Sequence, residues 1–157
     1  MESDLHKKLK KEAVDWLNQL GCSIVAEEVS FRGDLFDVVG IKDNGISYCI
    51  EAKATQEDLD KNRQVKNVYS QWRNSFNFCY LILPEGRLNP DWEWLDWGII
   101  RVPFANYELE HKLSLHIEKK SKRFESLKTF PETIEIIMAI AKRLTNQIYY
   151  QKSGAKP

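Results

Sequence analysis

Residues 34 to 53 read Asp-Leu-Phe-Asp-Val-Val-Gly-Ile-Lys-Asp-Asn-Gly-Ile-Ser-Tyr-Cys-Ile-Glu-Ala-Lys. Two apolar runs, Leu35–Ile41 and Ile46–Ala54, flank the turn-forming Asp-Asn-Gly, and both contain β-branched or aromatic residues. Each run has the length of a buried strand and is bounded by turn residues. The stretch therefore predicts a β-hairpin, around which the rest of the chain is organised.

Three charged side chains interrupt these apolar runs: Asp37 in the first, and Glu51 and Lys53 at the end of the second. Burying a charge costs free energy unless the charge is paired or binds a metal. Because side chains alternate between the two faces of a strand, Glu51 and Lys53 share one face. This end of the hairpin is therefore the candidate functional site.

The length of the turn decides whether Asp37 joins that face. A two-residue loop would place Asp37 opposite Ala52, on the other face. A three-residue loop at 43–45 would place it opposite Glu51, and Gly45 suits the left-handed position that closes such a loop. We predict the three-residue loop. It creates two neighbouring carboxylates, whose oxygens suit a hard divalent cation such as Mg²⁺ or Mn²⁺.

The same residues carry a family resemblance. Asp37 followed by Glu51-Ala52-Lys53, on a hairpin after an N-terminal helix, resembles the signature of the PD-(D/E)xK nuclease superfamily. The stretch Leu9–Pro103 is more closely similar to the MmcB-like DNA repair proteins and, more loosely, to archaeal Holliday-junction resolvases. The matching features are Leu20-Gly21, Phe36-Asp37-Val38-Val39, Ile50-Glu51-Ala52-Lys53, Asp58-Leu59, Tyr69, Phe78–Pro84 and Trp97-Gly98-Ile99-Ile100.

The resemblance implies an α/β, restriction-endonuclease-like core, with a mixed central β-sheet flanked by helices and an added C-terminal helix. It also implies a nuclease that hydrolyses DNA phosphodiester bonds in repair or recombination, often as a homodimer. Mg²⁺ or Mn²⁺ would be held by Asp37, Glu51 and the backbone carbonyl of Ala52. Lys53 would orient the attacking water or stabilise charge on the phosphorane.

Two helices are predicted to flank the hairpin and add candidate residues. Asp4–Leu20 carries one apolar stripe at helical spacing and is followed by a helix-ending glycine. In the superfamily a glutamate of the first helix often joins the metal site, which singles out Glu12. Glu27 or Glu28, near the end of the next predicted strand, could serve instead. A solvated side chain is the alternative for Glu12.

The second predicted helix, Thr55–Asn74, carries Gln64 where many members of the superfamily have a basic residue. Gln64 could support the attacking water or a phosphate, or it could simply be solvated. Basic side chains elsewhere are candidates for contacts with the nucleic-acid backbone, although a solvated face explains them equally well. They are Lys10, Lys11, Lys61, Lys66, Lys119, Lys120, Lys122 and Arg123.

Length and charge limit the class of protein. The chain has 157 residues, with 23 basic and 23 acidic side chains. We expect one domain over 1–157, with a core at about 4–103, a strand and helix extension at 104–150, and a frayed tail at 151–157. No apolar run is long enough to cross a membrane, and the charged N-terminus is not a signal peptide, so we expect a cytoplasmic protein.

Cysteines and histidines show no metal-ligand spacing. The three cysteines, Cys22, Cys49 and Cys79, are scattered and predict buried thiols of a reducing compartment. The three histidines, His6, His111 and His116, predict ordinary surface side chains. A zinc site is therefore not expected.

Two alternatives to an active nuclease stay open. The first is the same fold without catalysis, binding nucleic acid or protein; the balanced charge and the acidic, Trp-rich segment Asn89–Trp97 favour it. The second is a small α/β interaction protein in which Glu51 and Lys53 form only an ion pair. A surface pair is worth about 0–1 kcal/mol, which does not explain charges among apolar residues. Oxygens of Asp37 and Glu51 converging in a cleft would favour the enzyme.

Overall fold

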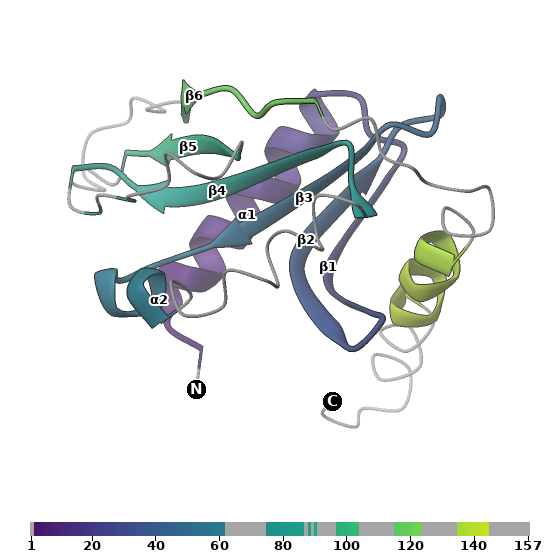
Figure 1. Cartoon of the computed structure of the whole chain (residues 1–157), viewed down its shortest axis with the longest axis horizontal. Coiled ribbons are helices and arrows are strands. Elements are labelled where there is room, and N and C mark those ends of the chain that lie inside the picture. Colours follow the sequence, from purple (N-terminus) through teal and green to yellow (C-terminus); the bar gives the residue numbers. More distant parts are fainter. Residues whose placement is uncertain are drawn as a thin grey trace.

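The protein folds as an α/β structure around one mixed sheet. The structure, a computed structural model, describes residues 2–61, 75–86, 88, 90, 97–103, 115–123 and 135–144. Among them, six strands form a single sheet in the order β1-β2-β3-β4-β5-β6 (Figure 1). The α/β class with a mixed sheet, expected from the sequence, is confirmed.

The elements follow one another along the chain in simple order. They are α1 (Asp4–Gln19), β1 (Ile24–Phe31), β2 (Asp34–Ile41), β3 (Ser47–Ala52), α2 (Gln56–Lys61), β4 (Phe78–Pro84), β5 (Gly98–Val102) and β6 (His116–Lys119), and residues 135–144 are also helical. The first three strands pair antiparallel, β3, β4 and β5 pair parallel, and β6 returns antiparallel to β5. None of the helices in the described ranges is long and apolar enough to span a membrane.

Helix α1 begins and ends as the sequence predicts. The Ser3 hydroxyl accepts a hydrogen bond from the His6 backbone N–H at 3.2 Å and caps the first turn. Gly21 follows the helix with a φ of +86°, a conformation that glycine adopts without strain. Between these ends, Leu9, Ala13 and Leu17 are fully buried against one face of the sheet.

The hairpin of β2 and β3 has the predicted register. Lys42 N–H donates to the Ile46 carbonyl at 2.9 Å, and Gly45, at a φ of +81°, donates to the Lys42 carbonyl at 2.8 Å. The strands then pair from Ile41 opposite Ser47 to Val38 opposite Ile50. The three-residue loop is therefore confirmed, and the ladder leads directly to the positions of Asp37 and Glu51.

Both faces of the sheet are covered. Helix α1 lies across one face, where its apolar stripe packs on residues such as Ile50 and Ile82 (Figure 1). On the other face, Phe36 and Leu81 belong to a second buried cluster, to which residues 135–144 contribute Ile136 and Ile140. The central strand β4 is buried from its second residue to its sixth, as expected for a strand covered on both faces.

The β1–β2 ladder is interrupted beside the candidate site. Glu27 pairs with Val38, and Val29 with Phe36, but no pair joins Glu28 and Asp37 between them. Glu28 has a φ of +53°, which reverses the alternation of faces along β1. The register is the same on both sides of the gap, so the interruption is confined to Glu28 and Asp37.

The remaining boundaries differ only in detail. From the sequence the first strand is expected over residues 22 to 31; it covers Ile24–Phe31, so it begins two residues later. All three cysteines are buried and unbridged, as predicted. Much of the second predicted helix, most of the Trp-rich segment and the C-terminal tail lie outside the described residues.

Candidate active site

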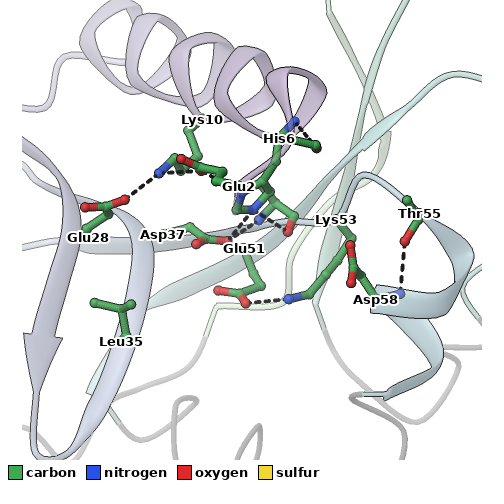
Figure 2. A pocket seen from close by; sticks show the side chains of 12 residues that line it. Glu2, His6, Lys10, Glu28, Leu35, Asp37, Glu51, Lys53, Thr55 and Asp58 are labelled. Atoms are coloured by element: carbon green, nitrogen blue, oxygen red, sulfur yellow. Dashed lines mark hydrogen bonds and ion pairs between the residues drawn. The ribbon is translucent and has the colours of Figure 1, made fainter.

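A cleft of about 560 Å³ opens between the first turns of α1, Glu28 of β1, the adjoining ends of β2 and β3, and the start of α2 (Figure 2). Its lining is dominated by charged side chains. The lining residues are Glu2, Ser3, His6, Lys10, Glu28, Leu35, Asp37, Glu51, Ala52, Lys53, Thr55 and Asp58. The cleft thus contains Asp37, Glu51 and Ala52, the three residues that the resemblance assigns to the metal, but not Glu12.

Glu51 is the most strongly perturbed group in the cleft. Its side chain is 10 % exposed, and Oε1 accepts a hydrogen bond from Lys53 Nζ at 2.7 Å. The second oxygen, Oε2, is buried and has no hydrogen-bond partner among the described residues. Burial raises the pKa of Glu51 to about 7; Lys53 opposes this rise, and the nearby charge of Asp37 adds to it. A buried carboxylate oxygen without a partner is a ready acceptor for a cation.

Asp37 lies in the same cleft and is held ionised. Its Oδ2 accepts the Ala52 backbone N–H at 2.8 Å and lies 3.4 Å from His6 Nε2. Burial would raise the pKa of Asp37, but the hydrogen bonds from His6 and Ala52 outweigh burial and lower the pKa below its usual range. The interrupted ladder at Asp37 therefore places a charged carboxylate beside the end of β3.

His6 is a cleft residue that the sequence analysis missed. Its Nδ1 lies 2.7 Å from Glu2 Oε1, and its Nε2 lies 3.1 Å from the Ala52 carbonyl oxygen. The hydrogen bond to Asp37 raises the pKa of His6, burial opposes the rise, and Glu2 adds to it. The expectation of an ordinary surface histidine was wrong. The available signal was helical spacing, because His6 lies on the same stripe of α1 as the buried Leu9 and Ala13.

Lys10 also differs from its expected role. Its side chain is only 4 % exposed, and its ammonium contacts Glu2 at 2.7 Å and Glu28 at 2.9 Å. Glu28 in turn accepts a hydrogen bond from Arg143 at 2.7 Å, which joins the C-terminal helical residues to the rim of the cleft. Lys10 is thus an internal partner of two carboxylates rather than a solvated contact for phosphates.

The other candidates separate into three groups. Glu28, one of the alternative acids, lines the cleft, whereas Glu12 is half-buried on α1 and does not. The basic residues Lys11, Lys119, Lys120, Lys122 and Arg123 are exposed or half-buried, and none of them lines the cleft. Gln64 and Lys66 lie outside the described residues, as does the side chain of Lys61.

The donor atoms fit a hard divalent cation. Within the described ranges, no three His, Cys, Asp or Glu side chains are already gathered as a metal-binding group. The carboxylates of Asp37 and Glu51 nevertheless line one cleft together with Ala52, and Glu51 Oε2 has no other described partner. Two carboxylates and a backbone carbonyl are the oxygen ligands that Mg²⁺ and Mn²⁺ prefer.

Fold and cleft together define an α/β protein with paired carboxylates and a lysine at the end of a central hairpin. No protein-family model matches the chain, and no curated protein matches it significantly. The fold is similar to that of a protein of unknown function from Silicibacter pomeroyi, with a TM-score of 0.73 and 13 % identity over 97 % of this chain and 94 % of that chain. That likeness shows a shared fold.

Two further solved structures match smaller parts of this chain. One is a repair endonuclease from Pyrococcus abyssi, 16 % identical over 57 % of this chain and 40 % of that chain, with a TM-score of 0.35. The other is SfsA from Pyrococcus furiosus in complex with Ca²⁺, 14 % identical over 74 % of this chain and 61 % of that chain, also with a TM-score of 0.35. Both scores are below the level at which a shared fold is inferred.

Proposed function

We propose that this protein is a metal-dependent nuclease of the PD-(D/E)xK type, which hydrolyses DNA phosphodiester bonds with Mg²⁺ or Mn²⁺. One observation carries the proposal: Glu51 is buried in an open cleft beside Asp37, and its Oε2 has no partner among the described residues. If Glu51 served only to pair with Lys53, one buried oxygen would be left unsatisfied at a cost of about 1–3 kcal/mol. Binding of a cation would remove that cost.

The residues of the cleft have separate roles in this proposal. Asp37, Glu51 and the Ala52 carbonyl hold the cation. When bound there, the ion supplies Lewis acidity toward the scissile phosphate and lowers the pKa of a water molecule. The Ala52 N–H fixes the carboxylate of Asp37 in its charged form.

Lys53 supplies positive charge to the reacting phosphate. An ammonium has three donors, so the contact with Glu51 leaves two for the attacking water or a phosphate oxygen. Its side chain is 11 % exposed and lines the cleft, where a fixed charge stabilises a developing phosphorane more strongly than in open water. Lys53 therefore acts on the reaction rather than on metal binding.

A binding module without catalysis is the second candidate function. It is favoured by the pairing of the basic residues around the cleft: Lys10 contacts Glu2 and Glu28, and Arg143 contacts Glu28. The charge of the chain as a whole is also balanced, with 23 basic and 23 acidic residues, whereas proteins that bind DNA are often basic.

Cleavage of labelled linear duplex, single-stranded and branched DNA, with Mg²⁺, Mn²⁺ or EDTA, tests the proposal. Wild type is compared with Glu51→Gln, and with Glu135→Gln as a control that makes the same chemical change at an exposed ion pair with Arg32. We expect metal-dependent cutting by wild type and the control, and none by Glu51→Gln. Binding without cutting would support the binding module. If the wild type neither binds nor cuts any of these DNAs, both functions are refuted.

A further inference from the structure

Helix α1 brings a nitrogen donor into the cleft through His6. Its Nε2 lies 3.1 Å from the Ala52 carbonyl oxygen and 3.4 Å from Asp37 Oδ2, so a single ring nitrogen faces two of the three proposed oxygen ligands (Figure 2). The His6 side chain is 24 % exposed and lines the cleft. Three donor atoms from α1, β2 and β3 thus converge on one point.

The spacing of these atoms is that of a coordination shell. Adjacent ligands of an octahedral ion with metal–ligand distances of about 2.1 Å are about 3 Å apart. The two separations at Nε2, 3.1 and 3.4 Å, are close to that edge length. The two oxygens therefore lie at distances from Nε2 that adjacent ligands of such an ion can adopt.

Glu2 holds the ring in the orientation that metal ligation needs. Its Oε1 lies 2.7 Å from His6 Nδ1, and Glu2 is itself anchored by Lys10 at 2.7 Å. Histidines that bind metals usually donate their other ring N–H to a carboxylate, which fixes the tautomer and directs the free nitrogen toward the ion. The Glu2–His6 pair has this arrangement. In the metal-free protein Nε2 also carries a proton, which the Ala52 carbonyl and Asp37 accept; a bound ion would replace that proton, while Nδ1–H stays on Glu2.

The geometry points to His6 as a ligand of the cation through Nε2, with Glu2 as the residue that positions its ring, an assignment that rests on the proposed metal-dependent function. Glu51 completes the set through Oε2, which has no described partner, while Oε1 keeps its contact with Lys53 (Figure 2). The resulting set contains one imidazole nitrogen among oxygens. Mn²⁺ accepts oxygen ligands as Mg²⁺ does, but as a transition-metal ion it tolerates an imidazole nitrogen better, so we expect this set to bind Mn²⁺ more tightly than Mg²⁺.

Calorimetric titration of the purified full-length chain with MnCl₂ and MgCl₂ tests this ligand. We expect wild type to bind Mn²⁺ at least about tenfold more tightly than Mg²⁺. His6→Ala should weaken Mn²⁺ binding by roughly 10- to 100-fold and change Mg²⁺ binding much less, so that the preference disappears. Glu2→Gln should also weaken Mn²⁺ binding, but by a smaller factor than His6→Ala does. His116→Ala, which removes an exposed histidine on β6, is the matched control and should bind both ions as wild type does.

A spectroscopic measurement separates ligation from a merely structural role. Pulsed electron paramagnetic resonance of the Mn²⁺-loaded wild type should show coupling to a directly bound imidazole nitrogen, and His6→Ala should lose it. Because the wild-type spectrum is informative by itself, the test stands even if the alanine variant does not fold. The assignment of His6 alone would be overturned by three results together. Mn²⁺ binding would be lost in Glu51→Gln and unchanged in His6→Ala, and the wild-type spectrum would show no nitrogen coupling. No binding of either ion by wild type would overturn both this assignment and the proposed metal site.

Discussion

Replacing Glu51 by glutamine should make the metal-free protein more stable than the wild type, by a margin that grows as the pH rises. Burial raises the pKa of Glu51 from 4.5 to about 7, which corresponds to about 3 kcal/mol of stability lost when the carboxyl ionises in the folded state. Glutamine has the shape of the protonated form and never ionises. We therefore expect the unfolding free energy of Glu51→Gln, relative to wild type, to increase by about 3 kcal/mol between pH 4.5 and pH 8.

The sign follows from proton binding in the two states. Since the pKa is higher in the folded protein, the unfolded chain loses its proton first as the pH rises above 4.5. Wild-type stability therefore falls through the window from pH 4.5 to about 7, and the loss is complete above it. The charged contact with Lys53 forms only when Glu51 is ionised, and its effect is already included in the pKa of about 7, so its loss in the variant adds no separate pH dependence.

Urea unfolding in EDTA at pH 5, 6, 7 and 8 measures this difference. Glu135→Gln, at a half-exposed position, should track wild type at every pH. Adding Mn²⁺ at pH 8 should raise the free energy of unfolding of the wild type but not of Glu51→Gln, because only the intact site binds the ion. A difference between variant and wild type that stays constant from pH 5 to pH 8 would refute the assignment of a buried, strained carboxylate to Glu51.

Three further substitutions test separate parts of the structure. Asp37→Asn should abolish calorimetric metal binding and cleavage together; retained metal affinity would remove this carboxylate from the ligand set. Lys53→Ala should slow cleavage by roughly 100-fold while metal binding persists, and loss of both would contradict the division of roles. Gly98→Ala should lower stability in urea unfolding by about 1–3 kcal/mol, because the added methyl group would overlap the Tyr80 ring and come within 2.7 Å of the Ser121 backbone nitrogen. An unchanged midpoint would mean that the β4–β5 contact is looser than described.

The hairpin was predictable because local rules determine it. A glycine with positive φ at position 45 closes a three-residue loop, and side-chain alternation then decides which residues face each other. The same kind of short-range information predicted the apolar stripe of α1 and the glycine that follows the helix. These features depend on residues that are neighbours in sequence or in one ladder, so no knowledge of the distant chain was needed.

The ion pairs around the cleft were not predictable in this way. Lys10 resembles its neighbours Lys8 and Lys11 in sequence, yet it alone of the three is buried, because it faces Glu28 on β1. The link from Arg143 to Glu28 joins residues more than a hundred positions apart. Composition and spacing contain no sign of such partners, since each one depends on how α1 and the C-terminal helical residues dock on the sheet.

The carboxylates and lysine of the candidate site follow from the primary structure, because charge inside apolar strands is costly and therefore conspicuous. The role of His6 does not follow from it. A histidine on the first turn of a helix becomes a cleft residue only when that helix crosses the sheet where β2 begins and β3 ends, which brings Nε2 to Asp37 and Ala52. Local propensity and alternation are properties of short segments, whereas donor atoms 31 and 46 residues away from His6 are brought to it only by packing of the whole domain.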